Sequence, residues 1–190
     1  NEIYTASTGV IGEFLDPKKI INEIKKNKPQ FSNCWNEAAK AIMTTDTFHK
    51  VTLDSCLIQN KKINLIGIAK GSGMIAPNMA TMLSFIFTDA NISSEVLQKL
   101  LVRETDKSFN SITVDNDTST SDTVLLTSTN SPKTDKITDI NDKNLNEFKK
   151  ILSKIMISLA KKIVIDGEGA KKLIQIKIVN AISEISAKKI

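Results

Sequence analysis

Residues 62–87 read KINLIGIAKGSGMIAPNMATMLSFIF and contain two apolar runs on either side of a turn. The first run, 62–68, is rich in β-branched residues and alternates in part with polar ones, and the second, 82–87, has a similar character. Both patterns are typical of β-strands, whereas the glycines and the proline between them are typical of turns. The stretch therefore predicts two strands joined by a glycine- and proline-rich turn.

The sequence on either side predicts helices with apolar faces and further short strands. Asp16-Pro17 is a helix N-cap followed by proline at the first helical position. From Phe148 to Leu159 apolar residues recur at intervals of three and four, as on one face of a helix. The expected elements are helices over 18–26, 32–43, 96–103 and 145–163, strands over 124–126 and 173–179, and a mobile surface loop over 127–144. Such a mixture predicts an α/β (α+β) fold in which sheets and helices form layers.

Composition narrows the class of protein. The net charge of the 190 residues is +5, almost all of it lysine beside acidic residues, with Arg103 as the only arginine. Arginine supplies bidentate contacts to bases and phosphates, so this charge predicts a solvated surface and no nucleic-acid partner. A run of about 20 apolar residues and a signal peptide after Asn1 are both absent, which predicts a soluble, cytoplasmic protein without a membrane span. Cys34 and Cys56 lack metal-ligand spacing, so we expect buried thiols and no metal site.

Ala80 and Thr81 stand where the turn meets the second strand. If the bond between them were cut, Thr81 would carry a free α-amine, whose ordinary pKa of about 8 makes it a base near neutral pH. Such an amine can take the proton of the neighbouring hydroxyl, which turns threonine into a nucleophile without a histidine. A strained, glycine-rich approach would favour cutting by the hydroxyl itself. The residues alone leave open the simpler interpretation, an ordinary turn that runs into a strand.

Five stretches spread along the chain carry a more specific signal. They are 5–12 (TASTGVIG), 41–47 (AIMTTDT), 70–83 (KGSGMIAPNMATML), 108–115 with 117–120 (SFNSITVD and DTST), and 166–170 (DGEGA). In this order they resemble the motifs of the ornithine acetyltransferases, the glutamate N-acetyltransferases of arginine biosynthesis, and the third resembles the family's self-cleavage motif. The resemblance implies the layered fold of this family and of the related self-cleaving aminopeptidases. It also implies that 1–80 is the C-terminal part of an α chain and 81–190 the N-terminal part of a β chain.

The resemblance implies an enzyme that moves an acetyl group from N2-acetyl-L-ornithine to L-glutamate. Self-cleavage at Ala80-Thr81 would free Thr81, which would carry the acetyl group as an acetyl-threonine intermediate. Thr8 and Gly9 would form the oxyanion hole, in which one donor contributes about 3 kcal/mol in comparable sites. From the residues alone, Thr8-Gly9 also fits a simple turn.

Three residues match substrate-binding positions of the family: Thr44, Lys70 and Glu168. The Lys70 ammonium would bind a substrate carboxylate, and the Glu168 carboxylate would face the cationic amine of ornithine. Without the resemblance, Lys70 also fits a solvated lysine at a strand end, and Glu168 an exposed residue of a capping turn. The family usually has Thr-Lys after Glu-Gly-Ala, whereas Lys171-Lys172 follows here, which leaves the detailed contacts to substrate open.

The resemblance covers the middle of the family's length, without the parts before and after it. It implies no cofactor, although acetyl-CoA would be an alternative acetyl donor, giving amino-acid N-acetyltransferase activity. The partners would be the two small-molecule substrates and the α and β chains of one precursor, assembled as two α and two β chains. Two alternatives stay open: a related N-terminal-nucleophile aminopeptidase or amidohydrolase that uses water as acceptor, and an inactive fragment of the transferase.

Overall fold

The two strands predicted around the glycine-rich turn lie side by side. The computed structural model describes residues 4–8, 12–27, 34–75, 82–117, 119 and 121–189. In it β2 (Lys61–Lys70) pairs antiparallel with β3 (Leu83–Thr88), from Leu65 opposite Thr88 to Lys70 opposite Leu83. The strand prediction is therefore confirmed on both sides of the turn.

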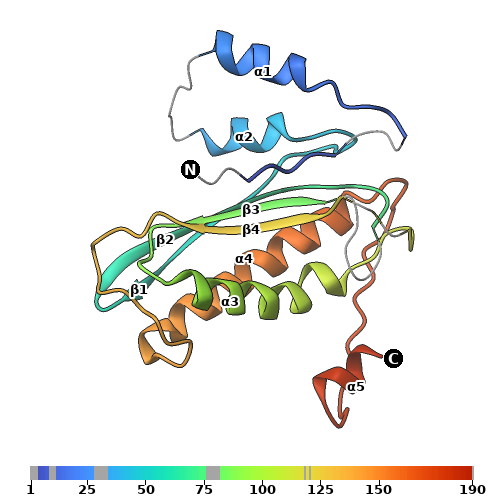
Figure 1. Ribbon diagram of the computed structural model, residues 1–190. Coiled ribbons are helices and arrows are strands. Elements are labelled where there is room, and N and C mark those ends of the chain that lie inside the picture. The colour runs from blue at the N-terminus through green and yellow to red at the C-terminus, as the bar shows by residue number, and fades with distance from the viewer. Residues whose placement is uncertain are drawn as a thin grey trace.

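These two strands are the centre of a four-stranded sheet ordered β1-β2-β3-β4 (Figure 1). β1 (Lys50–Ile58) pairs antiparallel with β2, and β4 (Thr123–Ser128) pairs parallel with β3. The other elements are α1 (Pro17–Lys26), α2 (Trp35–Ala41), α3 (Ser94–Lys107), η1 (Phe109–Ser111), η2 (Lys143–Leu145), α4 (Asn146–Ile165) and α5 (Glu184–Lys188). A parallel partner for β3 requires a long crossover, which α3 supplies.

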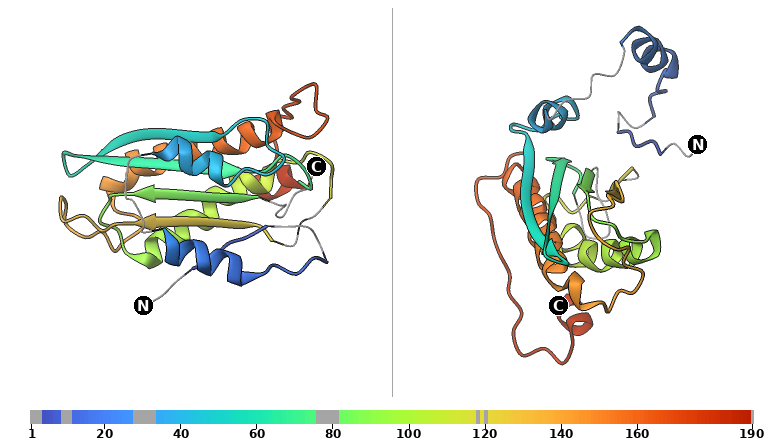
Figure 2. Two further views of the ribbon diagram at one scale, coloured as in Figure 1. Left: turned by 90° about the horizontal axis from the view of Figure 1, so that it is seen from above. Right: turned by 90° about the vertical axis from the view of Figure 1, so that its left-hand side faces the viewer.

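Helices α3 and α4 cover one face of the sheet, and α2 lies on the other (Figures 1 and 2). Helix α4 approaches β2 closely because Gly67 has no side chain: a Cβ there would stand 2.7 Å from Leu159 Cδ1. On the opposite face the rings of Trp35 and Phe87 lie 5.3 Å apart. The mixed α/β class with layered elements is confirmed, while the specific fold type stays a prediction.

The core between the sheet and α4 is aliphatic. The residues of α4 that repeat at three and four positions turn one face to the sheet, and they have no exposed surface: Phe148, Leu152, Ile155, Met156 and Leu159. Each such side chain contributes about 1.5–3 kcal/mol through burial. The helix predicted over 145–163 therefore forms as expected, and its apolar face holds the two layers together.

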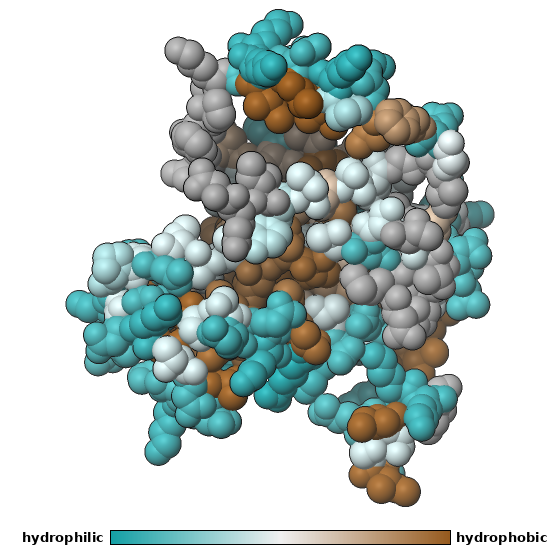
Figure 3. Space-filling view, in the orientation of Figure 1, coloured by the Kyte–Doolittle hydropathy of each residue, from teal (hydrophilic) through white to brown (hydrophobic). Residues whose placement is uncertain are grey.

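Helix α1 begins where the sequence predicts but does not join this core. Asp16 Oδ1 accepts a hydrogen bond from the Lys18 N–H at 3.0 Å, and Pro17 is the first helical residue. No residue of α1 is buried, and its exposed apolar face, which includes Ile20 and Ile24, is the brown underside at the top of Figure 3. Among the described residues, no helix combines the length and the apolar character needed to cross a bilayer.

The structure contains one strand, β1, that the sequence analysis did not predict. Conversely, the strand predicted over 173–179 is wrong. Residues 173–179 have no strand partner in the described part of the chain, and their apolar side chains, such as Ile174 and Ile176, are exposed. An alternating pattern stabilises a strand only where a neighbouring strand takes up its N–H and C=O groups. The pattern alone does not supply that neighbour.

Two smaller expectations need correction. The predicted loop 127–144 starts with the end of β4 and is anchored at its centre, because Ile137 is buried and exchanges backbone hydrogen bonds with Asn91 and Ser93, both at 2.9 Å. Of the two cysteines, Cys56 is buried as expected, and burial raises the pKa of its thiol to about 12. Cys34 is exposed, because it precedes the short helix α2 at the edge of the layers.

Candidate active site

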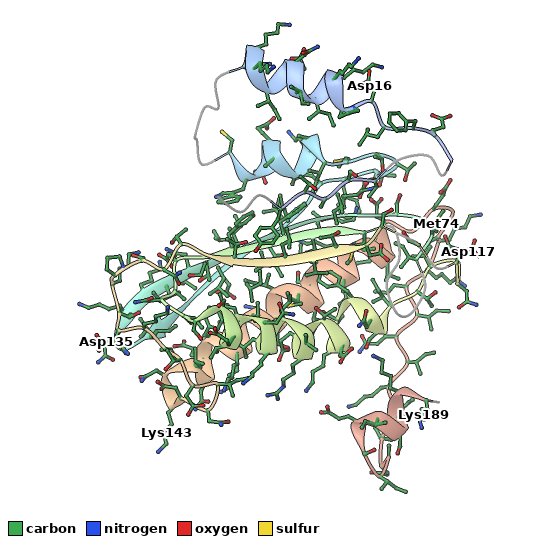
Figure 4. All side chains as sticks on the ribbon, viewed as in Figure 1. Asp16, Met74, Asp117, Asp135, Lys143 and Lys189 are labelled. Carbon is green, nitrogen blue, oxygen red and sulfur yellow. The ribbon has the colours of Figure 1, made fainter. Side chains whose placement is uncertain are left out.

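Several loops converge at the end of the sheet where β2 finishes and β3 and β4 begin. Lys70, Leu83 and Thr123 lie in one row across the sheet there. The turn after Lys70 and the loop before β4 meet at this end, where Met74 and Asp117 are labelled in Figure 4. Side chains from distant parts of the chain are thereby brought together.

Lys70 is buried, with only 3% of its surface exposed, although it ends a strand. Its ammonium donates a hydrogen bond to Thr44 Oγ1 at 3.1 Å. Burial lowers the pKa of this ammonium, and the positive charge of Lys50 lowers it further, while Asp46 and Asp122 act in the opposite sense. The interpretation of Lys70 as a solvated lysine is therefore wrong. Two of the residues predicted to bind substrate are in direct contact.

Beside Lys70 lies a second buried lysine, Lys50, between two aspartates. Its Nζ is 2.5 Å from Asp46 Oδ1 and 2.6 Å from Asp166 Oδ2, and none of the three side chains has more than 1% of its surface exposed. We call Asp46, Lys50 and Asp166 the ion cluster. Removing ions from water is costly, so such a cluster persists only where each charge has close partners.

The ion cluster holds three chain segments in place. Asp46 accepts hydrogen bonds from the Gly71 N–H at 2.8 Å and the Thr44 N–H at 3.2 Å, and Asp166 accepts the N–H and the hydroxyl of Thr47. Burial alone would raise the pKa of Asp46, but these N–H groups and the Lys50 ammonium together lower it. The loop with Thr44, the turn after β2 and the end of α4 are thus tied to one another by charge.

Glu168 lies against the turn that follows Lys70. Its N–H donates to the Ser72 carbonyl oxygen at 2.6 Å, and the Ser72 hydroxyl lies 2.6 Å from that of Thr45. Its carboxylate covers Gly73, where an added Cβ would stand 2.9 Å from Glu168 Oε2. The side chain is exposed, in keeping with its place in the turn after α4. All three predicted substrate-binding residues, Thr44, Lys70 and Glu168, therefore gather at this end of the sheet.

The chain leaves this turn in a strained conformation. Met74 has a φ of 55°, in the left-handed region that non-glycine residues rarely occupy. Asp115 holds it there by accepting hydrogen bonds from the N–H groups of Met74 at 2.5 Å and Ile75 at 2.8 Å. Strain of this kind is concentrated at functional sites, where the surrounding structure enforces it.

The predicted cleavage site falls outside the described residues. This applies to Ala80, Thr81 and Gly9, whose roles stay predictions. Thr8 is described and is half-buried at the end of the segment 4–8. Within the self-cleavage motif, the last described residue before Ala80, Ile75, and the first after Thr81, Met82, are both buried.

Sequence reasoning did not assign roles to the ion cluster or to Asp115. Asp46, Asp115 and Asp166 each stand within one of the five motifs, so the signal was present as an aspartate beside residues with assigned roles. Nothing in the sequence around Lys50 indicated a buried ion pair, because an isolated lysine is usually solvated. Its partner Asp166 is 116 positions away, a pairing that only the fold reveals.

This arrangement can bind a small zwitterionic molecule. An ammonium has three N–H donors, and Lys70 directs one of its three to Thr44, so a carboxylate would find donors on a buried cation. The exposed carboxylate of Glu168 offers the opposite charge on the neighbouring turn. Within the described residues, no group of three or more His, Cys, Asp or Glu is arranged to hold a metal ion.

Comparison with known proteins agrees with the five motifs. Residues 1–190 match the ArgJ family. The chain is 48% identical over 195 residues to the arginine biosynthesis bifunctional protein ArgJ of Brucella suis biovar 1 (strain 1330), covering all of this chain and 47% of that protein. The protein of the same name from Zymomonas mobilis subsp. mobilis is 44% identical over 187 residues, covering 98% of this chain and 46% of the relative.

The chain thus spans about half the length of the curated relatives it matches. Among solved structures, the PH0078 protein from Pyrococcus horikoshii OT3 aligns with a TM-score of 0.41 and 12% identity, over 63% of this chain and 40% of that one. The family match over the full 190 residues confirms the resemblance that the motifs indicated. The chain belongs to the ArgJ family.

Proposed function

We propose that the protein transfers an acetyl group from N2-acetyl-L-ornithine to L-glutamate in arginine biosynthesis, through an acetyl-threonine intermediate on Thr81. Membership of the ArgJ family supports the class of reaction. The observation that carries the proposal for this chain is the buried Lys70 ammonium against Thr44, at the strand end that leads into the self-cleavage motif. Both substrates are α-amino acid derivatives, and both bring a carboxylate to that ammonium.

The proposed cycle has two similar halves. The Thr81 hydroxyl attacks the acetyl carbon of N-acetylornithine, and its proton passes through the Thr81 α-amine to the nitrogen of ornithine, which leaves. The amine of glutamate then attacks the acetyl-enzyme, and the hydroxyl regains a proton as N-acetylglutamate leaves. Thr8 and Gly9 are proposed to donate hydrogen bonds to the oxyanion that forms in each half.

The charges of Lys70 and Glu168 suggest how the two ends of the substrate are oriented. The Lys70 ammonium is proposed to bind the α-carboxylate shared by donor and acceptor, with Thr44 holding that ammonium in place. Glu168 is proposed to lie near the second, cationic amine of ornithine. Lys171 lies three positions after Glu168 in the sequence, so this turn carries both a negative and a positive charge. No cofactor takes part in this cycle, and acetyl-CoA would enter as an alternative donor.

Self-cleavage is proposed to divide the chain into 1–80 and 81–190 without separating the parts. β1 and β2 come from the first part and β3 and β4 from the second, and all four belong to one sheet. The antiparallel β2–β3 pair spans the proposed cut. The assembly proposed for the whole protein is two α and two β chains.

Intact mass tests cleavage, and a product assay tests transfer. The unaltered protein should give two pieces that correspond to 1–80 and 81–190, and Thr81→Ala should remain a single chain without activity. Thr81→Ser should keep part of both activities because the hydroxyl is retained. Two pieces from Thr81→Ala would contradict the proposal. Ornithine released from N-acetylornithine only when glutamate is present indicates transfer, whereas equal release without glutamate would identify the hydrolase instead.

Substitution of Lys70 tests the carboxylate site. Lys70→Ala should raise the KM for N-acetylornithine about 10- to 100-fold, the equivalent of one charge-assisted hydrogen bond, while cleavage proceeds. Lys62→Ala is the matched control, because Lys62 lies on the same strand but is exposed. Equal loss of cleavage and of substrate binding in Lys70→Ala would assign Lys70 to processing rather than to substrate.

A further inference from the structure

Four consecutive residues before β1, residues 44–47, reach across to the end of β2 and the end of α4. Each of the four makes a hydrogen bond to a residue that is distant in the sequence. Their partners, in order, are Lys70, Ser72, Gly71 and Asp166. Three of these partners, 70–72, follow one another where β2 passes into the turn. We call residues 44–47 the clamp, since they hold this strand end.

Asp46 is the residue of the clamp that acts on both sides of Lys70. Its Oδ1 accepts the N–H of Gly71, the residue after Lys70, at 2.8 Å. Its Oδ2 accepts the N–H of Thr44 at 3.2 Å, and the Thr44 hydroxyl accepts the hydrogen bond from Lys70 Nζ at 3.1 Å. One buried carboxylate thus fixes both the backbone next to Lys70 and the acceptor of its ammonium.

Lys50 and Asp166 hold that carboxylate in place. Lys50 Nζ lies 2.5 Å from Asp46 Oδ1 and 2.6 Å from Asp166 Oδ2. Asp166 is fixed in turn, because both of its oxygens accept the N–H of Thr47. Asp46 therefore cannot turn away from its N–H donors without breaking an ion pair that is shielded from water, and that loss is costly.

The charges of the ion cluster and of Lys70 balance. Two aspartates and one lysine give the ion cluster a formal charge of −1, and the ammonium of Lys70 brings the sum to zero. A buried ammonium without an anion close by is unfavourable. The ion cluster therefore supplies the counter-charge that lets Lys70 carry its positive charge in a buried place.

The groups that face Lys70 act on its charge in opposite directions. Burial lowers the pKa of the ammonium most strongly, and Asp46 raises it. Lys50 lowers this pKa further, whereas Asp122, in the loop before β4, raises it. The ion cluster thus contains one residue that stabilises the charge of Lys70 and one that opposes it.

We propose that the ion cluster is the positioning device of the carboxylate site, an inference that rests on the proposed function. Asp46 orients the Lys70 ammonium and supplies its counter-charge, while Lys50 and Asp166 keep Asp46 in place. All three side chains of the cluster are closed off from the surface, so they act on a bound carboxylate through Thr44 and Lys70 and not by contact. Changes in the cluster should alter the affinity for substrate more than the rate of the acyl step.

The first test measures the pKa of Lys70 directly. In protein labelled with carbon-13 at lysine Cε, the NMR signal of Lys70 is assigned by its loss in Lys70→Arg and is followed against pH. Asp46→Asn should lower this pKa because the counter-charge is gone, and Lys50→Met should raise it because the opposing cation is gone. Asp54→Asn is the matched control, since Asp54 lies further along β1 and pairs with Lys154, and it should leave the pKa of Lys70 unchanged.

The second test separates affinity from rate. The KM for N-acetylornithine should rise about 3- to 10-fold in Asp46→Asn, the equivalent of one hydrogen bond, while kcat stays nearly unchanged. Asp54→Asn should leave both constants as they are. A fall in kcat with an unaltered KM in Asp46→Asn would contradict a role in carboxylate binding.

The direction of the two pKa shifts distinguishes positioning from general support of the fold. A merely structural role predicts shifts of the Lys70 pKa in the same direction in Asp46→Asn and Lys50→Met, because loosening admits water to the ammonium in both variants. Such a result, or an unaltered pKa in both folded variants, overturns the proposal.

If either variant fails to fold, Thr44→Val decides, because Thr44 is exposed and its N–H to Asp46 is retained. Loss of the hydroxyl that accepts from Lys70 should lower the pKa of Lys70, and an unaltered value overturns the proposal. Failure of the proposed function is seen separately. A parent protein that releases no ornithine overturns that function, and opposite pKa shifts in the same protein would still support the hold of the ion cluster on Lys70.

Discussion

The layer between α4 and the sheet and the ion cluster at the end of the sheet are both hidden from water, but different forces hold them. In the layer, side chains such as Ile155 and Leu159 pack without polar partners. In the ion cluster, Lys50 is equally buried but makes two ion pairs at 2.5 and 2.6 Å. One region is stabilised by the area it removes from water, the other by the direction and distance of a few contacts.

The difference assigns each region its task. Aliphatic packing is non-directional, and cores tolerate exchanges of similar volume. Paired charges in a buried place tolerate little displacement. When the two charges move apart, their attraction no longer offsets the free-energy cost of removing them from water. The layer therefore determines that sheet and helix lie together. The ion cluster determines where the loop with Thr44, the end of β2 with Lys70 and the turn with Glu168 lie. Substitutions in the two regions should fail in different ways.

The largest effect is expected from removing the cation of the ion cluster. Lys50→Met leaves Asp46 and Asp166 facing each other without a positive charge between them. The free energy of unfolding should fall by about 3–5 kcal/mol, the usual result of breaking a buried pair on one side. Urea unfolding at pH 7 measures it, with Lys154→Met as control, since the ion pair of Lys154 and Asp54 is open to solvent and should contribute far less. Equal losses in the two variants would show that burial does not distinguish them.

An intermediate effect is expected from crowding the aliphatic layer. Gly67→Ala places a methyl group 2.7 Å from Leu159 Cδ1, and overpacking of this kind costs about 1–3 kcal/mol. Leu159→Ala alone should cost about 2–5 kcal/mol by leaving a cavity, but the double variant should be more stable than the sum predicts because the two changes relieve each other. Thermal unfolding of the four proteins gives the coupling. If the losses of stability in the two single variants simply added in the double variant, α4 would have moved away from β2 to make room for the added methyl group.

The smallest effect is expected from pH. The folded pKa of Asp46 is lowered, so its contribution to stability is complete above the unfolded pKa of about 3.9 and is lost as the pH falls through the folded value. Asp46→Asn should therefore flatten the loss of stability below about pH 4, as followed by urea midpoints from pH 6 downwards. The pKa of the solvent-accessible Asp54 carboxyl is also lowered, by its hydrogen bond from Lys154. High salt should suppress the effect of Asp54→Asn while sparing that of Asp46→Asn, because screening acts on exposed charges.

Short sequence patterns correctly predicted those helices and strands whose formation depends mainly on neighbouring residues in the sequence. The Asp16 cap, the α4 periodicity and the β2 and β3 runs each contain their own signal, and the structure confirms them. The apolar residues at 173–179 have an equally good pattern and form no strand, because a strand depends on a neighbour that the pattern does not contain.

Residues of the candidate site divide in a similar way. Thr44, Lys70 and Glu168 followed from motif resemblance, and the fold brings them to one end of the sheet. Lys50 could not be found so, because its importance comes from burial and from a partner far away in the sequence, Asp166. From sequence alone a lysine or an aspartate is expected to be exposed to solvent, and only the fold shows that it is buried.

The pairing of β2 with β3 has a practical consequence. These neighbours lie on opposite sides of residue 80, and their ladder runs from Leu65 opposite Thr88 to Lys70 opposite Leu83. Two polypeptides made separately, 1–80 and 81–190, are complementary halves of one sheet, and each offers the other an open strand edge as a template. Fragment complementation would deliver Thr81 with its amine already free, so the chemistry of the nucleophile could be measured in a protein that never had to cut itself.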